Sequence, residues 1–243
     1  LNMDVKSPVK RHLPLEGSYN IRELGGYATL DGKYTRWQRV WRSDSLHNLS
    51  LKSQKALINQ GIKTIVDLRR DSEIKKHPNV LAKSPAVNYI NIPMFFDEQE
   101  PNIFYAETLQ KQYYVLLEDC QKQVKLIIEA IANSKPPILF HCAVGKDRTG
   151  LIAAFLLNIA NVSAATIAED YALSADYLAP LFAPEIEIAK KQGYGHIYES
   201  PPQVMLDTLN YLDNNYGGVT EYLRKIGLTN EHLSQLRGML VDR

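Results

Sequence analysis

A histidine, a cysteine, an arginine and a threonine lie close together in the stretch FHCAVGKDRTGL, Phe140 to Leu151. A short loop that leads from a strand into a helix directs several backbone N–H groups at one point, and the helix start adds partial positive charge. Gly145 lets the backbone turn close to a ligand, and Arg148 adds a planar fork whose geometry suits phosphate. The stretch therefore predicts a binding site for a tetrahedral oxyanion.

Cys142 begins this loop, where the same positive field favours the thiolate over the thiol. A thiolate at the bottom of a phosphate-binding cup is an activated nucleophile that faces an electrophilic phosphorus. We expect His141 to orient the loop by hydrogen bonds and to favour the thiolate further. We expect the Thr149 hydroxyl to donate to the sulfur, which would help the sulfur to leave in a second chemical step.

The overall composition is that of an ordinary globular domain. The 243 residues are 45% hydrophobic and 23% charged, with a formal net charge of +1, so a core of useful size can form. This balance gives no indication of a nucleic-acid partner. Two cysteines make no disulfide framework, and no apolar run is long enough for a transmembrane helix. No His or Cys spacing is typical of a metal site, so neither metal nor cofactor is expected.

The chain begins Leu1-Asn2-Met3, and no basic and then apolar signal segment opens it. Cytoplasmic localisation is the default expectation. Secretion stays open, because a removed export signal would also leave a chain without an initial methionine.

Short elements are predicted in the first part of the chain. Residues 1–16 are polar and are expected to form an N-terminal arm. The Asp31-Gly32 pair separates two β-like runs and predicts a hairpin. Ser50 is a suitable cap for a helix over residues 51–60.

Buried strands and a long helix are predicted before the loop. The runs 62–68 and 87–92, and the ILF run after two prolines, have the apolar, β-branched character of buried strands. Steps of three and four residues predict one face of a long helix, made by Leu109, Tyr113, Leu116, Cys120, Val124, Ile127 and Ile131.

Helices are predicted after the loop. A very apolar helix should cover residues 149–159, and the remainder should be mostly helical with a break at Gly217-Gly218. Residues 172–200 would form either a helical pair that acts as a lid or ordinary helical packing. Alternating strands and helices indicate an α/β layer protein, in which ligands bind beyond the carboxyl ends of the strands. The loop occupies that place.

The loop, read as C-x5-R with His before it and Thr after it, resembles the signature of the protein tyrosine phosphatase superfamily. Its full form HCAVGKDRTG resembles the bacterial tyrosine/dual-specificity branch, as do NIRELGGY at Asn20, IVDLRRDSE at Ile65 and NNYGGVTEYLRKIGL near the C-terminus. The resemblance implies an α/β fold with a phosphotyrosine-phosphatase-like central sheet, flanking helices and a helical C-terminal part. It also implies a single phosphatase domain over residues 1–243.

The resemblance implies a metal-free hydrolysis of phosphomonoesters in two steps, through a thiophosphoryl intermediate on Cys142. Phosphotyrosine would be a substrate, with phosphoserine, phosphothreonine and phosphoinositides as further classes, and inorganic phosphate would be the product. The three equatorial oxygens would be held by the Arg148 side chain and by the N–H groups of Ala143, Val144, Gly145, Lys146, Asp147 and Arg148.

Three carboxyl groups are candidates for the acid that protonates the leaving oxygen. Asp147 lies within the loop, as in the myotubularin lipid phosphatases. Asp97 follows a strand, where many dual-specificity enzymes carry an acid loop. Asp67 ends another strand. For Asp97 and Asp67 the alternative is helix capping or turn formation.

Three cations also have two interpretations each. Lys146 would select substrates with additional phosphates, or it would be an ordinary solvated lysine. Arg42 and Arg69 end strands and would support the cleft, or they would be structural ion-pair partners.

Two other functions compete with a phosphatase. One is a binding module that captures a phosphorylated partner without turnover, against which the intact Cys142 and Arg148 argue. The other is sulfur or arsenate chemistry. An arsenate reductase would need further resolving cysteines, and Cys120 is the only candidate.

Overall fold

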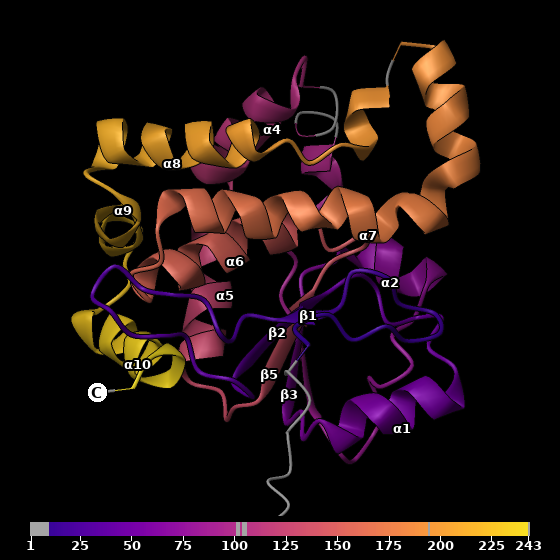
Figure 1. Ribbon diagram of the computed structural model, residues 1–243, viewed down its shortest axis with the longest axis horizontal. Coiled ribbons are helices and arrows are strands. Elements are labelled where there is room, and N and C mark those ends of the chain that lie inside the picture. The colour runs from indigo at the N-terminus through magenta and orange to yellow at the C-terminus, as the bar shows by residue number, and fades with distance from the viewer. Residues whose placement is uncertain (1–9, 101–102, 104–105, 194, 243) are drawn as a thin grey trace, which may run out of the picture.

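The computed structural model describes residues 10–100, 103, 106–193 and 195–242 (Figure 1). The first nine residues of the predicted arm lie outside this described part. The rest of the arm runs beside the first strand, because Leu13 N donates to Ile21 O (3.1 Å) and Glu23 N donates to Arg11 O (3.0 Å).

A five-stranded sheet with the order β1-β2-β5-β3-β4 forms the centre of the fold. Its four longer strands are parallel, and only β1 runs antiparallel to its neighbour β2. The strands are β1 (Arg22–Glu23), β2 (Val40–Ser43), β3 (Thr64–Asp67), β4 (Asn88–Asn91) and β5 (Ile138–His141). The predicted α/β class and the predicted strand positions are confirmed. Because the carboxyl ends of parallel strands share one edge, the chain segments that leave β2, β3 and β5 start close together.

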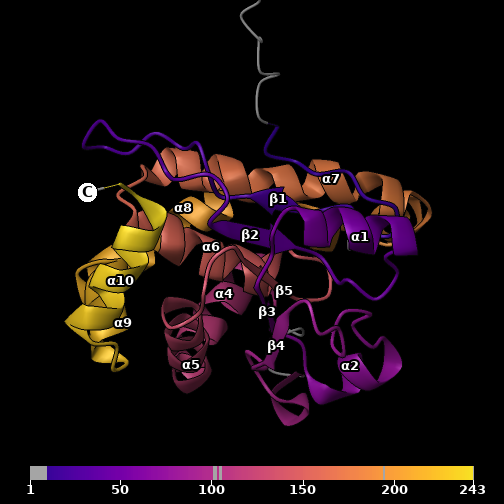
Figure 2. The same ribbon diagram turned by 90° about the horizontal axis from the view of Figure 1, so that it is seen from below.

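Side chains alternate between the two faces of the sheet. Ile65 and Leu139 face a core that contains Leu57 of α1 (Leu51–Asn59). Val66 and Phe140 face a larger core built by α5 (Gln121–Ala132) and α6 (Asp147–Ile159). Figure 2 shows α1 and α5 on opposite sides of the strands. Strands with both faces covered have no polar alternation, which is why their sequences are continuously apolar.

Helix α6 starts in the loop itself and is enclosed by other elements. Nearly all of its residues from Arg148 to Ile159 are buried. It packs against β2, β5, α7 (Ala164–Lys191), α9 (Val219–Lys225) and α10 (Asn230–Leu240). A helix that is apolar all round must be buried on all sides, and this burial fixes the direction of the helix start that faces the loop.

The predicted long helix before β5 is wrong in one respect. It is divided at Cys120 into α4 (Leu109–Asp119) and α5, because Cys120 has the non-helical angles φ −111° and ψ 17°. The predicted apolar face survives the break, since Tyr113, Leu116 and Cys120 itself are buried in the core.

The region expected as a helical pair is the second half of α7, followed by the short helix η2 (Gly195–Tyr198). Pro180 and Pro184 lie inside α7, and Figure 1 shows the helix changing direction along its length. Proline removes one backbone hydrogen bond and bends a helix. The segment then returns along α7, where Ser200 Oγ donates to Ala172 O (2.8 Å).

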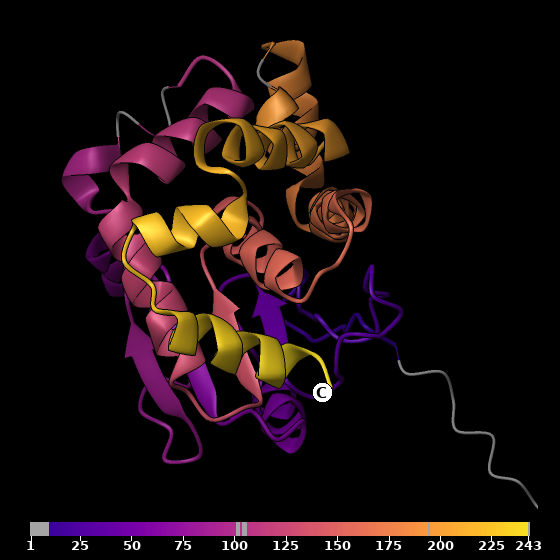
Figure 3. The same cartoon turned by 90° about the vertical axis from the view of Figure 1, so that its left-hand side faces the viewer.

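The C-terminal helices complete the fold (Figure 3). These are α8 (Pro202–Tyr216), α9 and α10, and α10 packs on α5 and α6. Gly217 ends α8 with a φ of +81°, which confirms the predicted glycine break. Within the described residues, every helix falls short of the length or apolar character that crossing a bilayer requires.

Candidate active site

The loop between β5 and α6 surrounds a small cavity of about 210 Å³ with Cys142 in its wall. Gly145 N donates to Cys142 Sγ at 3.3 Å. The residues that line this cup are Glu73, Phe95, Gln112, Leu116, Cys142, Ala143, Val144, Asp147 and Arg148. Sulfur, backbone amides and one guanidinium thus converge on one space.

The carbonyl groups of the loop point away from this cup. Each carbonyl oxygen from Cys142 to Gly145 accepts a hydrogen bond from a group outside the cup. The donors are, in order, His141 Nδ1 (3.0 Å), Ser45 N (2.9 Å), Asn20 Nδ2 (3.0 Å) and Arg42 Nη2 (2.8 Å). Because the N–H and C=O of a peptide unit point in opposite directions, the N–H groups of the loop turn inward.

Gly145 is required where the loop passes closest to β2. Its φ is +69°, and a Cβ there would lie 2.5 Å from Ser43 O and 2.6 Å from Asp44 N. Both contacts are with backbone atoms, which cannot move aside as a flexible side chain would. The position therefore excludes every other residue for a conformational and a steric reason.

Arg148 is held by a carboxylate that the sequence analysis did not select. Glu73 of α2 (Asp71–Lys76) accepts from Arg148 Nη1 and Nη2, both at 2.7 Å. Such a two-bonded pair fixes the plane of the guanidinium. Among the described residues, the other three N–H donors of Arg148 have no hydrogen-bond partner, and they are available to an oxyanion in the cup.

Arg148 and Glu73 each stabilise the charged form of the other. Burial alone would lower the pKa of Arg148, but the neighbouring Cys142 sulfur and the hydrogen bonds and ion pair with Glu73 outweigh burial and raise it. Burial likewise opposes ionisation of Glu73, yet its hydrogen bonds and ion pair with Arg148 lower the pKa of Glu73 to about 2. The pair therefore stays ionised over the whole physiological pH range.

Arg42 supports the loop from below and does not enter the cup. Besides Gly145 O, it donates to Asp170 Oδ2 (2.5 Å). Arg22 donates to the other oxygen of Asp170 (2.9 Å), as does Tyr27 (2.8 Å). Although burial opposes ionisation, the two arginines hold the pKa of Asp170 below its usual range. Arg42 therefore combines both interpretations: it supports the loop, and it is a buried ion-pair partner.

His141 is also a fully buried support. Because the Cys142 carbonyl can only accept, His141 Nδ1 carries the proton of that bond, and Asn79 Nδ2 lies 3.0 Å from the other ring nitrogen. Burial lowers the pKa of His141, so the ring is neutral. The hydrogen bonds expected of His141 are therefore present, whereas a cationic contribution to the thiolate is not.

The expected bond from Thr149 to the sulfur is absent. The Thr149 hydroxyl is buried, and it has no hydrogen-bond partner anywhere in the described part of the chain. Thr149 belongs to the first turn of α6, a helix enclosed on all sides, and the hydroxyl is buried with it.

The three candidate acids occupy different environments. Asp147 lines the cup. Asp67, the last residue of β3, is fully buried and accepts hydrogen bonds from Arg69 (2.7 Å) and Tyr89 (2.8 Å). Although burial opposes its ionisation, the pKa of Asp67 is lowered by His141, once that ring is protonated in acid, and by Arg69. Asp97 of η1 (Asp97–Gln99) lies outside the cup wall and pairs with Arg70 (3.1 Å).

Lys146 joins the loop to the segment after α7. Its ammonium donates to Ile197 O (2.6 Å) and to Glu199 O (2.9 Å). The side chain is only 4% exposed, so it is not an ordinary solvated lysine. Both partners are neutral, and among the residues that the structure describes the positive charge is paired with Asp147 Oδ1 alone, at 3.6 Å.

A larger chamber of about 360 Å³ adjoins the cup. The two cavities share three lining residues, Gln112, Val144 and Asp147. The chamber is also lined by Ala106, Thr108, Leu109, Lys146 and Ile197. A group bound in the cup thus has mainly apolar space beside it, bordered by one carboxyl and one ammonium.

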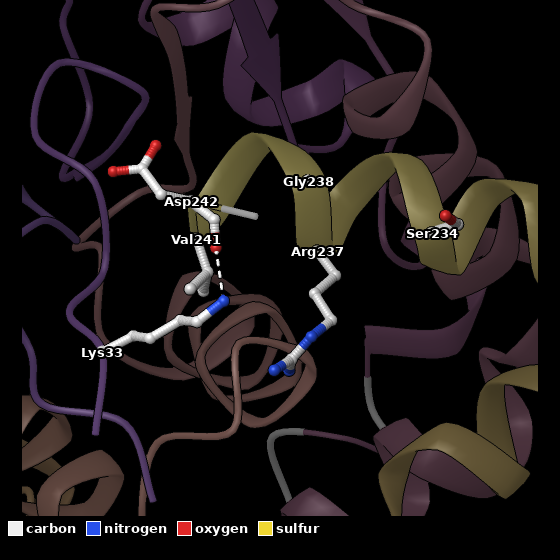
Figure 4. Close-up of a pocket in the computed structure, with 6 residues that line it drawn as sticks. All are labelled: Lys33, Ser234, Arg237, Gly238, Val241 and Asp242. Carbon is white, nitrogen blue, oxygen red and sulfur yellow. Dashed lines mark hydrogen bonds between the residues drawn. The ribbon is translucent and has the colours of Figure 1, made fainter. Parts of the chain in front are cut away.

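A separate pocket of about 220 Å³ lies at the end of α10 (Figure 4). Its two cations already have partners, since Lys33 Nζ donates to Asp242 O and Arg237 to Asp31, both at 2.9 Å. No cysteine, histidine or buried acid lines this pocket in the described part of the chain. The groups that can do chemistry are gathered at the loop instead.

Comparison with known proteins agrees with this geometry. The model of a family described as the tyrosine phosphatase family matches residues 13–242. The chain belongs to the tyrosine phosphatase family. The predicted enzyme class is thereby confirmed at the level of the family, and the two relatives described next are bacterial proteins, as the sequence resemblance implied.

Two curated relatives and two solved structures illustrate the match. A tyrosine-protein phosphatase of Nostoc commune is 31% identical over 81% of this chain and 72% of its own length. The triple specificity protein phosphatase PtpB of Mycobacterium tuberculosis is 22% identical over 95% of this chain and 99% of its own. Among solved structures, the chain shares 18% identity with the Siw14 catalytic core, over 75% of this chain and 97% of that chain (TM-score 0.41). It shares 19% identity with P. aeruginosa TpbA, over 58% of this chain and 71% of that chain (TM-score 0.38).

Gly145→Ala should abolish binding of inorganic phosphate, because the new Cβ would push the loop off Ser43 and Asp44. Gly32→Ala is the matched control. Gly32 has a similar φ of +77° but no atom within 4 Å of a Cβ, so only the conformational cost of about 1 kcal/mol applies. Calorimetric titration with phosphate and thermal unfolding would measure both effects. Phosphate affinity that is equal in the two variants would contradict this account of the loop.

Glu73→Gln should reduce the free energy of unfolding by on the order of 2 kcal/mol at pH 7. A lowered carboxyl pKa contributes stability above the unfolded value of 4.5, and the contribution is lost as the pH falls toward 2. Urea unfolding between pH 3 and pH 7 should thus show the variant and the unmodified protein converging in acid. Glu98→Gln, at an exposed position, should show no such convergence. A constant difference across this range would count against the ion pair.

Proposed function

We propose that this protein hydrolyses phosphomonoesters by covalent catalysis through Cys142. The observation that carries the proposal is the convergence of the Cys142 sulfur, the inward N–H groups and the Arg148 guanidinium on one cup. A phosphate group placed there meets a nucleophile and its charge-stabilising groups together.

In the first step, the Cys142 thiolate attacks phosphorus, and an S–P bond forms as the bond to the leaving oxygen breaks. The inward N–H groups and the free N–H donors of Arg148 hold the three equatorial oxygens, whose geometry they match best at the transition state. In the second step, water attacks phosphorus, the S–P bond breaks and inorganic phosphate leaves. Each step transfers phosphoryl without a change of oxidation state.

Asp147 is the acid that this mechanism assigns to the leaving oxygen. It is the one candidate of the three that borders both the cup and the adjoining chamber. A group in that position can give its proton to the leaving oxygen and later take a proton from the attacking water. The carboxylates of Asp67 and Asp97 each pair with an arginine, which favours structural roles for these two residues.

The substrate classes are phosphotyrosine, phosphoserine, phosphothreonine and phosphoinositides. The mainly apolar chamber supports an aromatic leaving group such as phenol. A relative named for triple specificity supports a broader range. The Lys146 ammonium donates to two neutral carbonyls and lies near the Asp147 carboxylate, and this charge supports a preference for substrates with an additional phosphate.

Cys142→Ser should lose turnover of p-nitrophenyl phosphate by several orders of magnitude while it still binds inorganic phosphate, with a chelator present throughout. The control is Cys120→Ala. Burial raises the pKa of the Cys120 thiol to about 12, so that side chain is not a nucleophile at neutral pH. Iodoacetate at pH 6 should modify Cys142 and spare Cys120. Full activity of the serine variant would contradict the mechanism, and phosphate binding without turnover in the unmodified protein would favour a binding module.

Lys146→Met should reduce kcat/KM for inositol lipids with two or three phosphates about tenfold more than for a phosphotyrosine peptide, because one charge contact is lost. The measurement is a panel of phosphotyrosine, phosphoserine and phosphothreonine peptides and mono- to trisphosphorylated inositol lipids. Equal losses on every substrate would show that Lys146 acts only by holding the segment at Ile197 and Glu199.

A further inference from the structure

In the described part of the chain, the Asp147 carboxyl is held through one of its two oxygens, Oδ1. Tyr113 Oη donates to Oδ1 at 3.1 Å, and Lys146 Nζ lies 3.6 Å from the same atom. Oδ2 receives no hydrogen bond from any residue that the structure describes. Because Asp147 borders the cup and the chamber, Oδ2 is the oxygen that remains free to exchange a proton with a bound substrate.

Tyr113 is suited to hold Oδ1 in this way. It lies on α4, is fully buried, and its ring packs edge-on against Tyr171 at a centroid distance of 5.9 Å. Burial, with Tyr171 and Asp147 nearby, raises the pKa of Tyr113 well above its ordinary value. The phenol is thus neutral at any pH at which an enzyme works, and it remains a donor.

The other charged and titratable groups around Asp147 are less able to set its orientation. Lys146 gives its shorter bonds to Ile197 O and Glu199 O, and its contact with Asp147 is the longest of the three. Arg148 is directed to Glu73. Tyr171 and Cys142 also lie nearby, and neither of them donates a hydrogen bond to Asp147.

We propose that Tyr113 is a positioning residue for proton transfer: its hydroxyl fixes Oδ1 of Asp147, so that Oδ2 presents the proton to the leaving oxygen. The inference rests on the proposed role of Asp147 as the acid. As the S–P bond forms and the P–O bond breaks, the proton passes from Oδ2 to the leaving oxygen. Asp147 becomes a carboxylate, and the hydrogen bond from Tyr113 stabilises the new charge.

The test compares leaving groups of different basicity. Phenyl phosphate releases a phenolate whose conjugate acid resembles tyrosine, with a pKa of about 10, and it needs an acid. The p-nitrophenolate released by p-nitrophenyl phosphate is a far weaker base and needs little protonation. We would measure kcat/KM for both substrates, because this ratio reports the first chemical step, and the inhibition constant of inorganic phosphate as a check on the cup.

Tyr113→Phe should lower kcat/KM for phenyl phosphate by about tenfold, the order of one hydrogen bond to a charged group. The value for p-nitrophenyl phosphate and the phosphate inhibition constant should change less than about twofold. Asp147→Asn should show the same selectivity more strongly, and Tyr113→Phe should add no selectivity in that background. The control is Tyr222→Phe, which removes another buried hydroxyl, one that donates to Leu117 O at 2.7 Å. It should leave the ratio of the two substrates unchanged.

If Tyr113→Phe loses activity equally on both substrates, or loses none on either, the inference is overturned. The proposed acid still stands in that case, provided that Asp147→Asn is selective for phenyl phosphate. If Asp147→Asn is itself unselective, the acid assignment fails and the inference fails with it. Should the phenylalanine variant not fold, Tyr113→Met is the alternative. It also removes the hydroxyl while it keeps a large apolar side chain at this position, and the same selectivity is expected of it.

Discussion

A concave array of inward N–H groups can exist only where the carbonyl groups of the same peptides find partners elsewhere. Here four successive carbonyls, from Cys142 to Gly145, accept hydrogen bonds from the preceding histidine and from two other segments of the chain, one at Asn20 and one at Arg42 and Ser45. The cup is thus shaped from outside. Its N–H groups are already oriented before a ligand arrives, so binding requires little reorganisation of the backbone.

Burying the charged side chains that support the loop costs free energy. Asp170 is shared by two buried arginines, and the three side chains together carry one excess positive charge. Removing charges from water is expensive unless each is paired and hydrogen-bonded. Arg42 meets this condition in part through Gly145 O, so the group that stabilises the core of the fold also orients the loop. The excess charge adds to the positive potential beneath the cup.

The loop could be predicted from the sequence because its reactive residues are close together along the chain. Cys142, Gly145 and Arg148 lie on one short segment, and the strand before it and the helix after it have clear apolar signatures. Glu73, Asp170 and Tyr113 could not be assigned in this way, because each reaches the loop through tertiary packing alone. Glu73 lay within a motif already noted for its resemblance, and the spacing of Tyr113 correctly indicated a core position but not the hydroxyl contact with Asp147.

Local rules failed where tertiary contacts decide the outcome. The helix periodicity across Cys120 continues through a real break, because the apolar spacing is compatible with two helices that share one core. The Thr149 hydroxyl also differs from expectation, because its surroundings depend on how α6 is enclosed rather than on the local sequence.

The bond between Asn20 and Val144 joins residues 124 positions apart, and that between Arg22 and Asp170 joins residues 148 apart. Contacts this distant along the chain form late, since a large loop must close first. During synthesis on the ribosome, the arginines of β1 and β2 have no counter-ion until the chain has been extended to Asp170. A nascent chain that stops short of Asp170 would hold two arginines that cannot be buried, and this favours completion of the cup only after synthesis has passed α7.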